Sequence, residues 1–196
     1  MHNNVENNQD INSSSASAFA FSFFLFFVLF AAGAAADLWT KDAAFQALGM
    51  PGEYRRIEQP ELESAYYLWN GVFGFQTSLN TGALFGLGQG QVHILAVLSF
   101  VFLAGIICYV LLFAWKSRFL TVILAFISAG IFGNLYDRLA FHGITDVDGN
   151  TISAVRDWIL VLFGSYRYPN FNIADSMLVC SAVLLVVYSL WFDKRV

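Results

Sequence analysis

Two aspartates in the second half of the chain have the residue type and setting for acid–base chemistry. Asp157 lies in an apolar stretch, and Asp175 follows 18 positions later, just inside a second apolar segment. The sequence 166–170 between them is typical of a loop, so the chain can fold back and bring the carboxyl groups together. Two close carboxyl groups cannot both ionise cheaply, so one keeps a proton and the pair can act as base and acid toward water. This pattern favours hydrolysis by an aspartate pair.

Each of these acids also has an ordinary interpretation. A carboxylate at membrane depth costs about 2.5–3.5 kcal/mol on insertion scales, which favours a functional or paired role for Asp175. The alternative is an N-terminal cap, since acids favour helix starts. Asp157 could instead form a surface salt bridge with Arg156 or Arg167.

The composition indicates a small integral membrane protein that must position these acids. The chain has 196 residues, of which 58% are hydrophobic and 12% are charged, against about 25% charged in a soluble domain. The net charge of −4 argues against a nucleic-acid partner. Cys108 and Cys180 lie inside apolar runs, which favours packing residues over a disulfide framework or a zinc site.

Four segments are long and apolar enough to cross a bilayer as helices. At about 1.5 Å per residue they span roughly 27 to 36 Å, close to the ~30 Å of a hydrocarbon core. They are residues 16–36, 92–115, 119–136 and 173–192. Ala34-Ala35-Ala36 also fits a signal-peptide cleavage site, but the leader lacks Lys and Arg and the apolar stretch is too long. The Asn- and Ser-rich residues 1–17 are predicted to be a disordered cytoplasmic tail.

With four crossings, four helix ends lie on the same side of the membrane. They are the end of the first segment, the start of the second, the end of the third and the start of the fourth. The same side holds the long loops, 37–91 and 137–172, and almost every unusual polar residue. The three-residue turn 116–118 and the C-terminal residues 193–196 carry four basic residues, so their charge density favours a cytoplasmic location for both termini. The total number of basic residues favours the opposite orientation, because six of them lie on the long-loop side.

Five short segments occur in order at the ends of these predicted helices. They are Asp37–Lys41, Asn80–Phe85, Gly133–Arg138, Val155–Trp158 and Phe171–Ser176. Together they resemble the signature blocks of the lipoprotein signal peptidase (signal peptidase II) family, over residues 17 to 196. Any single block is weak, because Asn80-Thr81-Gly82 alone is a common turn and Asp137 could simply pair with Arg138.

The resemblance implies an all-α membrane protein with four transmembrane helices and a small extracytoplasmic β-cradle. The peptidase domain would cover residues 18–196, with extracytoplasmic loops 42–91 and 139–172. The activity implied is that of an aspartic endopeptidase that cleaves prolipoproteins before the diacylglyceryl-modified cysteine. It would act in the bacterial inner membrane among membrane lipids, with no cofactor, no metal and no obligate protein partner. The aromatic stretch 66–75 would form the cradle.

The resemblance also assigns roles to residues of this chain. The catalytic pair would be Asp157 and Asp175. The substrate-binding residues would be Asn80, Gly82, Asn134, Arg138 and Asn172. The supporting residues would be Asp37, Lys41 and Asp137.

Two long loops depart from compact family members, at 42–79 and 139–156. The second contains Asp146-Val147-Asp148-Gly149-Asn150, which partly fits a calcium loop although its Gly is misplaced, so a polar turn is the default. Two other classes stay open: a transporter with an acid relay, and an inactive scaffold that binds lipidated peptides.

Overall fold

A computed structural model of the chain describes residues 2–51, 65–82, 90–113, 117–146 and 148–192. Several sequence features lie outside these ranges: residues 83–85 of the second motif, Trp115 and Lys116, and the basic C-terminal residues 193–196. For residues 2–15 and 192 only the backbone is described.

Four helices in the described part of the chain are long and apolar enough to cross a membrane. They are α1 (His2–Leu48), α2 (Val92–Phe113), α3 (Arg118–Arg138) and α4 (Ile173–Phe192). The last three agree with the predicted segments to within two residues at each end. Ser117 caps α3, since its hydroxyl accepts a hydrogen bond from the Leu120 N–H at 3.2 Å.

Helix α1 is longer than predicted at both ends. It begins at His2, so residues 2–17 are helical where the composition predicted a disordered tail, and it continues to Leu48 where a loop was predicted from Asp37. An apolar span supplies the helix nucleus, and extension then adds one hydrogen bond for each residue fixed. No proline or glycine interrupts residues 37–48, and the helix ends before Gly49, which has a φ of 85°.

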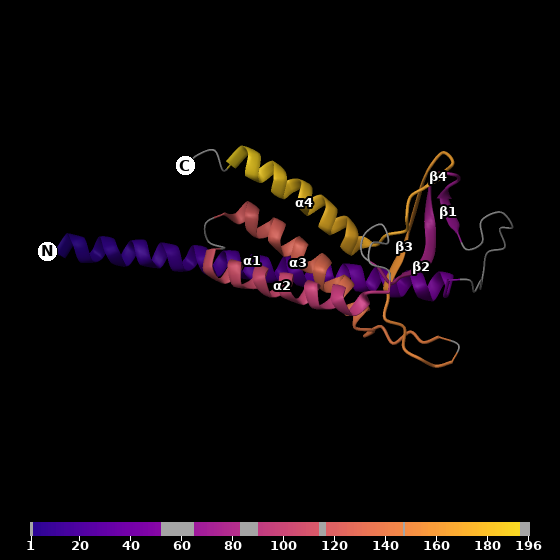
Figure 1. The fold of residues 1–196 in the computed structure, drawn as a ribbon. Coiled ribbons are helices and arrows are strands. Elements are labelled where there is room, and N and C mark those ends of the chain that lie inside the picture. Colours follow the sequence, from indigo (N-terminus) through magenta and orange to yellow (C-terminus); the bar gives the residue numbers. More distant parts are fainter. Residues whose placement is uncertain (1, 52–64, 83–89, 114–116, 147, 193–196) are drawn as a thin grey trace.

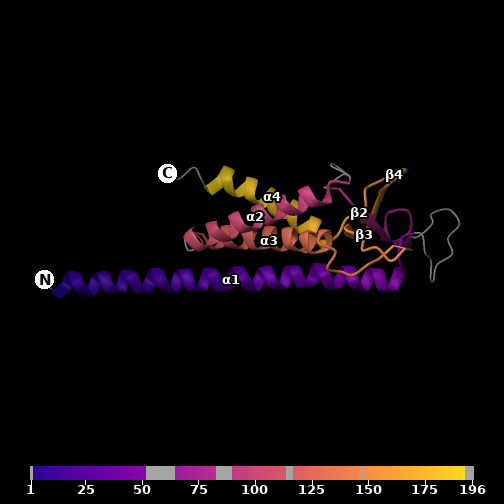
Figure 2. The same cartoon turned by 60° about the horizontal axis from the view of Figure 1, so that its bottom comes forward.

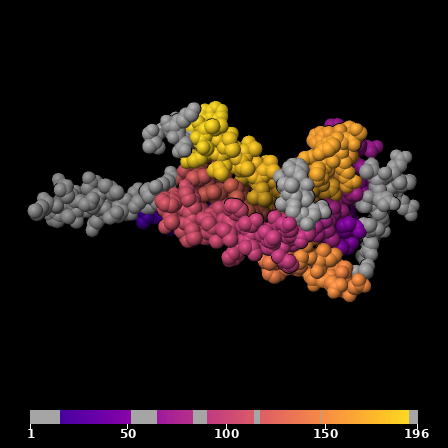
Figure 3. Space-filling model, in the orientation of Figure 1, coloured from indigo at the N-terminus to yellow at the C-terminus, as the bar shows by residue number. Residues whose placement is uncertain are grey.

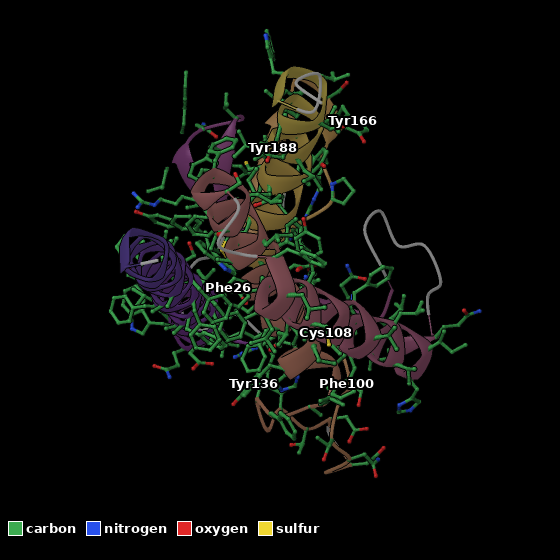
Figure 4. The ribbon with its side chains drawn as sticks, turned by 90° about the vertical axis from the view of Figure 1, so that its left-hand side faces the viewer. Phe26, Phe100, Cys108, Tyr136, Tyr166 and Tyr188 are labelled. Carbon is green, nitrogen blue, oxygen red and sulfur yellow. The ribbon has the colours of Figure 1, made fainter. Side chains whose placement is uncertain are left out.

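Helix α3 is the centre of the helical part, and the other three helices pack around it (Figures 1 and 2). Small residues allow the close approach. A Cβ at Gly33 would lie 2.9 Å from Cβ of Ala129, and one at Gly130 would lie 2.7 Å from the carbonyl oxygen of Ala174. Phe26 fills the space where α1 meets α2 and α3 (Figure 4). Many large apolar side chains on the described helices, such as Phe100, are exposed, as expected of surfaces that face lipid.

A four-stranded antiparallel sheet lies at one end of the helices, opposite the end where α1 begins and α4 stops (Figure 1). Its strands are β1 (Tyr66–Trp69), β2 (Phe73–Asn80), β3 (Val155–Phe163) and β4 (Tyr166–Arg167), paired in that order. The aromatic stretch predicted to form the cradle therefore does form β1 and β2. Strand β3, which carries Asp157, was not predicted.

The connection between α3 and β3 projects from the side of the molecule opposite the β3–β4 hairpin (Figure 3). The Asp146 carboxylate in this connection accepts hydrogen bonds from the N–H groups of Asp148 and Asn150, at 2.9 and 2.8 Å. These local donors to Asp146 are typical of a polar turn, which is the default interpretation of this sequence.

Candidate active site

Asp157 and Asp175 lie on either side of Asn172, at the junction of the sheet and α4. The Asn172 side-chain N–H₂ donates to Oδ1 of Asp157 at 2.7 Å, and its backbone N–H donates to Oδ2 of Asp175 at 3.3 Å. Strand β3 supplies Asp157 and the first turn of α4 supplies Asp175. Two carboxyl groups 18 positions apart in sequence are therefore held by one buried asparagine.

Asp175 also forms a capping box with Asn172. Oδ1 of Asn172 accepts from the backbone N–H of Asp175 at 2.9 Å, while the Asp175 carboxylate accepts the Asn172 N–H in return. The capping interpretation of Asp175 is thus correct, yet it uses only one carboxylate oxygen. The other, Oδ1, accepts from the side-chain N–H₂ of Asn134 at 2.8 Å.

A buried lysine fixes the direction of the Asn134 amide. Nζ of Lys41 donates to Oδ1 of Asn134 at 3.1 Å, and the Asn172 amide donates to the same oxygen at 3.1 Å. With its oxygen turned toward these donors, Asn134 must present its N–H₂ group to Asp175. The lysine thereby orients a donor on the acid pair without touching either acid.

Lys41 itself is held between two buried carboxylates. Its Nζ lies 2.7 Å from Oδ2 of Asp37 and 3.1 Å from Oδ2 of Asp137, and all three side chains are fully buried. Oδ1 of Asp37 accepts the backbone N–H of Ala174 at 2.8 Å, which ties α1 to the start of α4. The three residues predicted to support the site are therefore joined through Lys41, which also contacts Asn134.

Two of the alternative salt bridges are not formed. Asp137 does not pair with its neighbour Arg138; it pairs with Lys41 and with Arg156, whose Nη2 lies 3.0 Å from Oδ1 of Asp137. The Arg156 side chain consequently points away from Asp157. In a strand, successive side chains point to opposite faces, which puts Arg156 and Asp157 on different sides of the sheet.

Asn80 and Arg138 complete the polar rim. The Asn80 side-chain N–H₂ donates to Oδ2 of Asp157 at 3.2 Å, and its Oδ1 accepts the N–H of Gly82 at 2.9 Å. Nη2 of Arg138 donates to the Gly82 carbonyl at 3.2 Å. All ten predicted site residues therefore belong to one connected group.

Two cavities meet at this group. The first, of about 370 Å³, is lined by Asn80, Asn134, Arg138 and Asp175 together with apolar residues of β3 and α4. The second, of about 450 Å³, lies between α2 and α4 over α3. Asn134, Arg138 and Asp175 line both cavities, so Asp175 is the acid that a ligand in either one would meet.

The environment of Asp157 favours its protonated form. Burial raises the pKa of Asp157 to about 8, with the nearby charge of Asp175 acting in the same direction. The hydrogen bonds from Asn80 and Asn172 favour the ionised form but are outweighed. At neutral pH the pair therefore retains a proton, as an acid–base pair requires.

Gly133 allows Asp37 to reach its place, because a Cβ there would collide with Oδ2 of Asp37 and lie 3.0 Å from its Cγ. We expect Gly133→Ala to displace Asp37 and with it Lys41, lowering kcat for the substrate proposed below by up to about 10²-fold. Gly105→Ala is the matched control, since a Cβ at Gly105 would meet nothing within 4 Å. Equal rates for the two variants would contradict this role of Gly133.

Comparison with known proteins decides the family. The model of the signal peptidase (SPase) II family matches residues 18–191. The chain belongs to the signal peptidase II family. It is therefore a peptidase, and with its four apolar helices it is a multi-pass membrane protein, which rules against the transporter alternative.

Individual relatives are lipoprotein signal peptidases as well. A lipoprotein signal peptidase of Rhodopirellula baltica is 43% identical over 165 residues, covering 83% of this chain and 70% of the relative. One of Bacillus pumilus is 33% identical over 139 residues, covering 71% of this chain and 83% of the relative.

Two solved bacterial membrane enzymes share the fold. The first has a TM-score of 0.66 and 20% identity, covering 87% of this chain and 90% of its own. The second has a TM-score of 0.62 and 21% identity, covering 86% and 94%.

Sequence reasoning missed two charged residues near the site. Asp42 on α1 pairs with Nη1 of Arg156, for which the sequence suggests only Asp157 as a partner. Asp42 lies beyond the predicted end of the first helix, so nothing in its setting marked it. The cysteines were predicted to be packing residues, but both are exposed on their helices, and Cys180 lines the first cavity.

Proposed function

We propose that this family member removes signal peptides from prolipoproteins, cleaving before a diacylglyceryl-modified cysteine, with Asp157 and Asp175 as the catalytic pair. The observation that carries the proposal is that both carboxyl groups are held by Asn172 while Asp175 opens onto both cavities. The lipoprotein signal peptidases among its relatives give the substrate class.

The second cavity suits the apolar part of such a substrate. Its walls are formed mainly by apolar side chains of α2, α3 and α4, among them Leu95, Phe102 and Leu178, and Asp175 also lines it. An apolar signal segment lying in this groove would bring its polar end to the acid pair. The lipid chains of the modified cysteine would stay in the bilayer.

The acid pair would then split the peptide bond with water. One aspartate accepts a proton from the attacking water, while the other donates a hydrogen bond to the scissile carbonyl and later protonates the leaving nitrogen. Asn80 and Arg138 line the first cavity, and together with Gly82, which contacts both, they would bind the substrate backbone. Asn134 and Asn172 would hold the two carboxyl groups, with Asp37, Lys41 and Asp137 supporting them.

The orientation follows from the same proposal. Both termini would be cytoplasmic, and the sheet and the acid pair would face the extracytoplasmic side of the bacterial inner membrane. The exposed aromatic side chains of β1, such as Tyr66 and Trp69, suit a position at the membrane interface.

Cleavage of matched substrates tests this function. The purified protein in detergent is incubated with a diacylglyceryl prolipoprotein and with the same polypeptide lacking the lipid, and the products are weighed by mass spectrometry. We expect a single cut before the modified cysteine and far slower turnover of the unlipidated form. Binding without cleavage would instead support the scaffold alternative.

The rate should fall on the alkaline side of neutrality. Because the pKa of Asp157 is raised to about 8, the shared proton is present below that pH and is lost above it. We expect kcat to decline as the pH rises through about 8, as initial rates across a buffer series would show. Rates that stay constant to pH 10 would exclude a required proton on this pair.

A further inference from the structure

Arg156 is a buried cation that has no part in the reaction proposed above. The residue is 2% exposed. Its Nε and Nη2 donate to Oδ1 of Asp137 at 3.1 and 3.0 Å, and Nη1 pairs with Asp42. Its backbone N–H donates to Oδ2 of the same Asp137 at 2.9 Å. Such a planar, multiply bonded guanidinium fixes geometry as well as charge.

These contacts join three elements directly beside the acid pair. Asp42 lies on the last part of α1, Asp137 lies at the end of α3, and Arg156 belongs to β3. The residue after Arg156 is Asp157, and the Arg156 carbonyl accepts a hydrogen bond from the Asn172 side chain at 3.4 Å. A shift of Arg156 would therefore carry Asp157 with it.

The same cluster reaches Asp175 through polar side chains. Asp137 shares Lys41 with Asp37, and Lys41 orients Asn134, which donates to Asp175. The clamp formed by Asp42, Arg156 and Asp137 thus bears on both acids, on Asp157 through the backbone and on Asp175 through Lys41.

The clamp lies apart from the substrate cavities. Among the described residues that line the two cavities at the acid pair, neither Arg156 nor Asp42 occurs. A residue that touches no substrate but holds the reacting groups should affect kcat and leave KM nearly unchanged.

We propose that Arg156 and Asp42 are positioning residues that lock β3 onto α1 and α3 and so hold Asp157 within reach of Asp175. This inference rests on the proposed function of the acid pair. It extends the site to two side chains to which the family resemblance assigned no role.

Kinetics of Arg156→Gln and Asp42→Asn on the lipidated substrate test the clamp. We expect kcat to fall by up to about 10²-fold in Arg156→Gln, and less in Asp42→Asn, with KM unchanged in both. Asp42 is half exposed and Arg156 keeps its other partner, so Asp42→Asn should fold even where Arg156→Gln does not. Arg118→Gln, at the far end of α3, and Asp148→Asn, in the exposed turn, are charge-matched controls expected to retain the wild-type rate.

Arg156→Lys tests whether the planar geometry of the guanidinium matters, apart from its positive charge and its effect on folding. It keeps the positive charge but cannot bond both Asp137 and Asp42 in the same planar arrangement. We expect its pH–rate profile to coincide with that of the wild type while kcat stays low. The profile of Arg156→Gln should move to higher pH, because loss of a nearby positive charge disfavours the ionised carboxylates, while Lys41 and Arg138 remain in place.

Wild-type kcat in Asp42→Asn and Arg156→Lys, or an equal loss in the two controls, would overturn the clamp while leaving the proposed function intact. A decrease in kcat that is fully explained by less folded protein, measured by thermal unfolding in detergent, would also overturn it. Failure of the wild-type protein to cleave the lipidated substrate would instead overturn the proposed function.

Discussion

Asp157→Asn and Asp175→Asn should each abolish cleavage of a lipidated substrate while the protein is still made and folded. Removing either carboxyl group leaves no pair that can both accept and donate a proton, a contribution of about 10²–10⁴-fold in rate. Both substitutions preserve shape and keep an oxygen that can accept from Asn172. Single-turnover assays with purified protein, quantified by mass spectrometry, would measure the loss.

Asp148→Asn serves as the control, because this acid lies exposed in the turn between α3 and β3. Thermal unfolding in detergent shows whether the catalytic variants remain folded. Turnover near the wild-type rate by either one would remove the acid pair from the mechanism.

Lys41→Met should produce the largest loss of stability. Lys41 is fully buried between Asp37 and Asp137, and its removal leaves buried carboxylates without their shared cation. Breaking a buried ion pair in this way costs about 3–5 kcal/mol. Activity should fall as well, because Asn134, which donates to Asp175, loses one of the two donors that orient its amide and keeps only Asn172. Thermal unfolding in detergent and the cleavage assay would measure the two effects.

The double variant Asp37→Asn with Lys41→Met provides the control. It removes the carboxylate that depends most on Lys41, while Asp137 keeps Arg156. We therefore expect the double variant to recover much of the stability but not the activity, since pairs in one network are not additive. A Lys41→Met protein as stable as the wild type would contradict the pairing described here.

The helices were predictable because length and apolarity alone define a membrane span. The aromatic strands β1 and β2 were placed only by the family resemblance. Strand β3 was harder to predict, because its residues 158–163 form a continuous apolar run that lacks the alternation of a half-buried strand. The extension of α1 was missed because the apolar signal ends at Ala36, whereas helical hydrogen bonding continues to Leu48. Propensity and the stop at Gly49, rather than hydropathy, set that boundary.

The motifs named the ten residues of the connected group but not the contacts that connect them. The motifs named Asp37, Lys41 and Asp137 without showing that a single ion cluster joins them. Sequence spacing offered Arg138 and Arg156 as partners of the adjacent acids, whereas strand alternation and helix ends turned these side chains elsewhere. Nothing in the sequence marked Asp42, because its contact with Arg156 depends on α1 continuing alongside β3.

The central claim is that Asp157 and Asp175 work as one unit that holds a proton at neutral pH. Infrared titration of the protonated carboxyl C=O stretch, in the wild type and in Asp157→Asn, measures that proton directly. We expect a band in the wild type that disappears as the pH rises through about 8 and is absent from the variant at neutral pH. A wild-type protein with no protonated carboxyl band at neutral pH, or a band that persists in Asp157→Asn, would contradict it.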